Sequence, residues 1–139
     1  GIAVSAMSEG VLPLSQHSTR IVGDVTYHDY EGIALDLDER ARLTRDLGLT
    51  SRSMVLKNHG LLALGRTVSE AFMLMYNFEQ SCRIQVDALA AGRDRITLIP
   101  ESAVERTRAQ INRPRAEGER RDWPALLRML DRRQADFRS

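Results

Sequence analysis

Residues 53–91 constrain the fold more strongly than any other part of the sequence. Two short apolar runs, 53–56 and 61–65, flank the polar tetrapeptide Lys57-Asn58-His59-Gly60. Asparagine and glycine favour tight turns, so the pattern predicts two short buried strands joined by a turn. Such strands need an apolar layer packed against them, and the next segment of the chain has the pattern to supply it.

That next segment carries the signals of a long helix. Thr67-Val68-Ser69-Glu70 is a capping box, in which the threonine hydroxyl and the glutamate carboxylate accept hydrogen bonds from unpaired N–H groups at the helix start. Gly92 suits the left-handed turn that ends many helices. We therefore predict a helix over about 67–91 with one apolar face toward a core. The residues of that face are Val68, Ala71, Phe72, Met75, Phe78, Cys82, Val86 and Leu89.

Shorter patterns predict the remaining elements. The β-branched stretch 21–27 predicts a strand, and 38–47 predicts a helix. A further helix is expected over 100–112, because proline suits the first helical turn. Residues 113–121 are rich in arginine without a large apolar residue, so we expect an exposed linker there. The stretch 122–139 is predicted to be an amphipathic helix.

The composition indicates the location of the protein and the partners that it is expected to bind. No stretch approaches the ~20 apolar residues needed to cross a bilayer, so we expect no membrane span. Cys82 is the one cysteine, which excludes a disulfide framework and agrees with a reducing, cytoplasmic location. Residues 105–139 hold 10 arginines against 6 acidic residues. Acidic residues are interleaved with these arginines and no aromatic platform accompanies them, so nucleic acid is not expected as a partner.

Among the three histidines, His59 is the strongest candidate for chemistry. It lies in the predicted turn between two apolar strands, where an imidazole can serve as a metal ligand or simply close the turn through hydrogen bonds. Zinc usually takes three protein ligands even when one position stays open for substrate. No HxH or HExxH motif is present. The side chains that could complete a site are His17, His28, Asp24, Asp29 and Glu31, at spacings that match no metal motif.

His17 and His28 have simpler interpretations. Serine and threonine hydroxyls in 15–19 could orient the ring of His17 or form a Ser–His nucleophilic pair, although no Gly-x-Ser-x-Gly elbow supports the pair. His28 lies in Tyr27-His28-Asp29-Tyr30, for which a polar strand end facing solvent is the simpler explanation.

Taken together, these motifs resemble the class II aldolase/adducin family. The resemblance rests first on 55–67, where Asn-His-Gly-Leu leads through an apolar strand to the helix start at 70–72. The stretches 12–16, 27–32 and 122–128 also look like the adducin-like bacterial branch of the family. The similarity runs along essentially the whole chain but covers only the latter part of the family's domain.

The resemblance implies a three-layer α/β/α domain with a mixed central sheet, incomplete at its N-terminus. Residues 1–112 would form the C-terminal portion of that domain, before the linker and the final helix. In catalytic members the family implies a divalent metal, usually zinc, held by three histidines. His59 matches the third, and the family's His-x-His pair stands just ahead of the position of Gly1. We therefore expect a metal in an intact parent protein and none in this chain alone.

Two functions follow from the resemblance. The first is a lyase-type reaction on a small carbonyl compound in the intact parent, inactive in residues 1–139 alone. His59 would be a metal ligand, and His17 an acid or base near a neighbouring subunit's site. The second is a non-catalytic, adducin-like interaction domain of the actin cytoskeleton type. The family also implies a homo-oligomer, with a tetramer expected.

Overall fold

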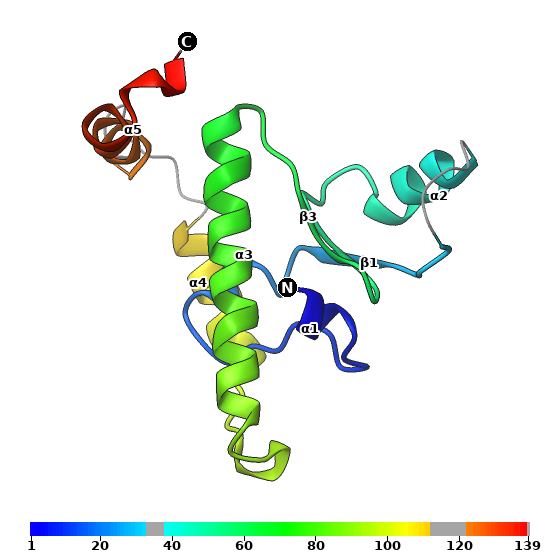
Figure 1. Ribbon diagram of the computed structural model, residues 1–139. Helices are drawn as coiled ribbons and strands as arrows, with labels where there is room; N and C mark the ends of the chain where they lie inside the picture. Colours follow the sequence, from blue (N-terminus) through cyan, green and yellow to red (C-terminus); the bar gives the residue numbers. More distant parts are fainter. Residues whose placement is uncertain (33–37, 112–121, 139) are drawn as a thin grey trace.

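The computed structural model describes residues 1–32, 38–111 and 122–138 (Figure 1). The predicted linker 113–121 lies outside the described residues, as does the last residue of the predicted helix 100–112.

Three short strands form one mixed sheet. They are β1 (Val25–His28), β2 (Ser53–Leu56) and β3 (Gly60–Ala63), in the order β1-β2-β3. β1 is parallel to β2, and β2 is antiparallel to β3, so the predicted pair of strands joined by a turn is confirmed. The predicted strand 21–27 begins only at Val25. Before it, the chain turns back on itself, with the N–H groups of Asp24 and Val25 both donating to the carbonyl of Ile21.

Helices account for most of the rest. The predicted helix 38–47 is confirmed as α2, and the long helix is confirmed as α3. The α-helices are α1 (Ile2–Ser5), α2 (Asp38–Leu47), α3 (Val68–Leu89), α4 (Glu101–Ile111) and α5 (Asp122–Arg133), and the 3₁₀ turns are η1 (Ser18–Arg20), η2 (Arg93–Arg95) and η3 (Ala135–Arg138). The final helix is thus shorter than the predicted 122–139, since a 3₁₀ turn comes after it. No helix in the described ranges has both the length and the apolar character that spanning a bilayer requires.

The strands bury different side chains on the two faces of the sheet, because successive residues point to opposite sides. Val55 packs into the main core with residues of α1 and α3. Thr26, Met54 and His28 share the opposite face, where His28 contacts α2. In Figure 1, α3 lies on one side of the sheet and α2 on the other, which confirms the three-layer α/β/α arrangement. The main core cluster is Val4, Val11, Ile21, Val55, Phe78 and Cys82.

The start of α3 is capped nearly as the sequence predicts. The Thr67 hydroxyl accepts a hydrogen bond from the N–H of Glu70 at 3.2 Å. The Glu70 carboxylate in turn accepts from the N–H of Arg66 at 3.1 Å, one residue earlier than in the predicted box. Gly65 is required just before this cap, because a Cβ there would lie 2.4 Å from the N atom of Ala71. The connection from β3 to α3 is therefore tight.

Only the middle of α3, from Phe78 to Gln85, is well buried. Phe78, Cys82 and Gln85 are almost fully buried, whereas Val68 and Phe72 are 75% and 46% exposed. The predicted apolar face thus remains partly open near the helix start, and Val86 near its end is also 39% exposed. α5 covers a part of it, since the rings of Trp123 and Phe72 meet at 5.5 Å with a 60° tilt.

Candidate functional site

His59 is held on a turn that three backbone hydrogen bonds fix in place. Asn58 adopts a left-handed conformation with φ of 58°, which asparagine tolerates better than most residues. Its N–H donates to the carbonyl of Ser5 at 3.0 Å, so the turn is tied to α1. The N–H of Lys57 donates to the carbonyl of His28, and that of His59 to Leu56. The β2–β3 turn is therefore anchored to α1 and to the end of β1.

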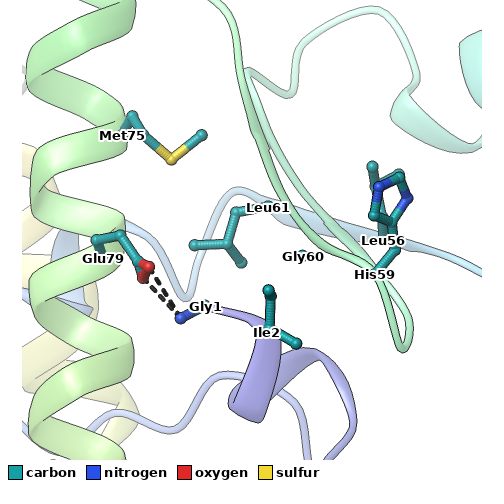
Figure 2. A pocket seen from close by; sticks show the side chains of 8 residues that line it. All are labelled: Gly1, Ile2, Leu56, His59, Gly60, Leu61, Met75 and Glu79. Carbon is teal, nitrogen blue, oxygen red and sulfur yellow. Dashed lines mark hydrogen bonds and ion pairs between the residues drawn. The ribbon is translucent and has the colours of Figure 1, made fainter.

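A cavity of about 290 Å³ lies between the start of the chain, the β2–β3 turn and α3. On the α3 side, the Glu79 carboxylate accepts a hydrogen bond from the amino group of Gly1 at 3.0 Å. The exposed imidazole of His59 lies at the end of the cavity away from α3 (Figure 2). The lining residues are Gly1, Ile2, Leu56, His59, Gly60, Leu61, Met75 and Glu79.

The imidazole of His59 is free to bind a ligand. Among the described residues, no hydrogen bond or ion pair engages its ring nitrogens. A solvent-accessible imidazole on an anchored turn suits one ligand position of a zinc-type site. The same part of the chain contains no group of three or more histidine, cysteine, aspartate or glutamate side chains able to hold a metal. The residues present therefore fit one ligand of such a site and do not complete it.

The carboxylates that could have joined His59 are each paired with a cation elsewhere. Ion pairing leaves them oriented toward guanidinium or ammonium groups rather than toward the imidazole. The pairs are Asp24 with Arg108 (2.9 Å), Asp29 with Lys57 (2.6 Å) and Glu31 with Arg42 (2.7 Å).

His28 is buried, so the prediction of a strand end facing solvent is wrong for this residue, although Tyr27, Asp29 and Tyr30 are exposed. Its side of the sheet is covered by α2, and His28 is only 3% exposed. Nδ1 lies 2.8 Å from the Asp46 carboxylate, while Nε2 is buried without a hydrogen bond and lies 3.9 Å from Glu39. The hydrogen bond with His28, then that with Arg45, lowers the pKa of Asp46 below its ordinary value. His28 thus joins α2 to the sheet, away from the His59 cavity.

His17 sits on the other side of α3. It precedes η1, and its Nδ1 lies 3.3 Å from Oδ1 of Asn77. A helix turns about 100° per residue, so Asn77 points roughly opposite to Met75 and Glu79, which line the cavity. One copy of the chain therefore does not bring His17 and His59 together.

The Ser18 and Thr19 hydroxyls are not paired with His17 as nucleophiles. Ser18 donates to the carbonyl of Ser15 at 2.8 Å, and Thr19 donates to that of Gln16 at the same distance. These bonds hold the turn that carries His17, so the Ser–His pair considered from the sequence is not formed by these hydroxyls.

Cys82 packs in the core, as its place on the apolar face of α3 predicts. It is fully buried, and burial raises the pKa of its thiol to about 11. A thiol with that pKa is protonated at neutral pH and is a poor nucleophile.

The fold and the His59 turn define a class of α/β/α proteins in which a histidine lies on the turn between two short strands and a capped helix follows the second strand. The profile described as the Class II Aldolase and Adducin N-terminal domain matches residues 1–86. The chain belongs to this class II aldolase/adducin family, as its motifs predict.

Relatives are found on both the aldolase and the adducin side. An aldolase class 2-type protein of Caulobacter vibrioides is 44% identical over 137 residues, which are 99% of this chain and 53% of that protein. Alpha-adducin of Mus musculus is 37% identical over 142 residues, covering 94% of this chain and 19% of its own length. The chain thus spans about half the length of the bacterial relative.

Solved structures support the same fold. The crystal structure of an aldolase II superfamily protein from Pseudomonas syringae is 44% identical, with a TM-score of 0.91 over 100% of this chain and 55% of that chain. An L-fuculose 1-phosphate aldolase from Glaciozyma antarctica is 26% identical, with a TM-score of 0.67 over 81% of this chain and 41% of that chain.

Proposed function

We propose that this chain contributes His59 as one ligand of a divalent metal site in a lyase-type enzyme that acts on a small carbonyl compound. The observation that carries the proposal is that His59 and the first two residues of the chain border the same cavity. Residues joined directly before Gly1 in a longer polypeptide would meet this cavity at its Glu79 end, across from the imidazole. To complete the proposed site, they would have to cross the cavity and supply the ligands that the described residues lack.

Zinc is the metal that this proposal favours, because neutral imidazole is among its preferred ligands. A bound divalent metal would polarise a carbonyl or enediolate oxygen and so stabilise negative charge next to the carbon that reacts. Within this chain, the anchored turn would fix the direction from which His59 approaches. The Glu79 carboxylate would border the opposite end of the cavity.

His17 is proposed as an acid or base at the site of a neighbouring copy. Because α3 separates the His17 side from the cavity side, both histidines can serve one substrate only if two copies each contribute one of them. The proposal therefore includes a homo-oligomer, with a tetramer as the expected form. A cytoplasmic location is also proposed, since the one cysteine is unpaired.

Mixing two inactive variants tests this arrangement. His17→Ala and His59→Ala are prepared separately in the full gene product, then dissociated and reassembled together. Release of aldehyde from a panel of ketose 1-phosphates is the readout. If sites combine residues of two copies, random mixing restores about one quarter of the sites, although each variant alone is inactive. Recovery of no activity in the mixture, with an active wild type treated in the same way, would refute the shared site.

A non-catalytic interaction domain is the second candidate. The observation in its favour is the 37% identity to alpha-adducin over 94% of this chain. That function needs neither a metal at His59 nor a free imidazole at His17. A full gene product that binds no divalent metal and cleaves none of the panel would favour it.

A further inference from the structure

The hydrogen bonds around Asn77 assign the position of a proton on His17. The Nδ2 group of Asn77 donates to the carbonyl of Met73 at 2.7 Å, one turn earlier in α3. Its Oδ1 atom faces Nδ1 of His17 at 3.3 Å. Turning the amide over would set Oδ1 against the Met73 carbonyl at the same short distance. Two acceptors would then repel each other, so the helix itself fixes the orientation of Asn77.

The fixed amide leaves only one role for Nδ1 of His17. Amide Oδ1 is an acceptor, so Nδ1 must carry the hydrogen in the bond between them. In a neutral imidazole the other nitrogen, Nε2, then has the free lone pair. Nε2 of His17 is not among the buried unpaired atoms, and no hydrogen bond to it is found in the described ranges. It is therefore an accessible acceptor.

The backbone around His17 is fixed by local hydrogen bonds and by burial of the residues that follow it. Ser15 and Ser18 exchange hydrogen bonds, with each N–H donating to the other's hydroxyl at 2.9 and 3.2 Å. Ser18 and Thr19 are 1% and 2% exposed, and η1 contacts both α3 and α4. The backbone that carries the ring is therefore fixed beside Asn77.

We propose that Asn77 is a positioning residue that keeps His17 in the Nδ1–H tautomer, so that Nε2 is the atom through which His17 exchanges a proton. The catalytic part of this inference rests on the proposed function. Acting as a base, Nε2 takes a proton from substrate or water, and the bonding electron pair stays on the atom that loses it. The imidazolium that forms keeps its Nδ1–H bond to Asn77 and returns the same proton from Nε2 when it acts as an acid.

Histidine-ring NMR tests the tautomer without any need for substrate or metal. Residues 1–139 are labelled with ¹⁵N in the histidine rings and studied at about pH 8.5, two units above the ordinary histidine pKa. The His17 signals are assigned from their loss in His17→Gln. We expect a protonated-type shift for Nδ1 and an unprotonated-type shift for Nε2. A wild-type spectrum with the proton mainly on Nε2 would overturn the proposal, whatever any variant does.

Two variants separate positioning from general structure. Asn77→Leu removes the acceptor, so Nδ1–H should cease to be the dominant form. Gln80→Leu, a matched change three residues further along α3, should leave the spectrum unchanged, because among the described residues no hydrogen bond joins Gln80 to His17. An unaltered His17 tautomer in folded Asn77→Leu would also refute the role of Asn77.

In the active gene product, Asn77→Leu should lower kcat by about tenfold, less than the ~10²–10⁴-fold that general acid–base catalysis itself contributes. If the gene product proves to have no lyase activity while the tautomer is as assigned, the proposed function fails and the positioning claim stands. If the gene product has lyase activity but the proton of His17 lies mainly on Nε2, the positioning claim alone is rejected.

Discussion

Replacing Gln85 by methionine should destabilise the fold strongly, because its carboxamide satisfies a buried loop. Gln85 is 1% exposed on α3. Its Oε1 accepts from the N–H of Leu12 at 2.8 Å, and its Nε2 donates to the carbonyl of Gly10 at 2.7 Å. Methionine fills similar space but can neither accept from nor donate to these groups. An N–H and a carbonyl would then be buried without partners.

Leaving a buried polar group unsatisfied costs about 1–3 kcal/mol, so the two groups together predict a loss of about 2–6 kcal/mol. That is a large part of the roughly 5–15 kcal/mol by which folded domains are usually stable. Urea denaturation monitored by circular dichroism measures the difference, and the slope with denaturant should not change. If Gln85→Met is unfolded without urea, both proteins are compared in a stabilising osmolyte.

Gln80→Met is the matched control for this substitution, because it makes the same chemical change on a less buried part of the same helix. It should cost no more than about 0.5 kcal/mol. A loss for Gln85→Met as small as that of the control would refute the claim that Gln85 holds residues 10–12 in place.

Two further predictions concern ionisable groups. Because burial raises the pKa of Cys82 to about 11, its thiol should react with a chromogenic disulfide reagent at about pH 8 only after unfolding; rapid reaction in the native protein would contradict its place in the core. The pKa of Asp46 is lowered from its ordinary 3.8, chiefly by the hydrogen bond with His28. The ionised Asp46 carboxylate thus stabilises the fold above that value, and this contribution is lost as the pH falls through the lower, folded-state pKa. Asp46→Asn should therefore flatten the acid dependence of stability between about pH 5 and 2. An unchanged acid profile would exclude this contribution.

Local patterns were enough to predict the elements that depend on neighbouring residues. The β2–β3 turn follows from Asn58 and Gly60, and the start of α3 from Thr67 and Glu70, because in each case the chemistry lies within a few residues of the chain. The start of β1 was predicted too early. Ile21 is β-branched and buried like a strand residue, but it belongs to a turn that only tertiary packing reveals.

Contacts between distant segments were beyond the reach of these patterns. The burial of His28 depends on α2 covering its face of the sheet, and the contact between His17 and Asn77 joins residues 60 positions apart. Gln85 did leave a signal, since it is a polar residue three positions after Cys82 on a largely apolar face of α3. A polar residue in that position needs a buried partner, but the sequence does not say which one.

The metal content of the full gene product tests the central claim most directly. Purified wild type, His59→Ala and the control His17→Ala are dialysed and analysed for zinc and other divalent metals. We predict about one metal ion per subunit in wild type and in His17→Ala, and a near-complete loss in His59→Ala, because removing one of three protein ligands weakens a site severely. Full occupancy in a folded His59→Ala protein, or no metal in wild type, would contradict the assignment of His59 as a ligand.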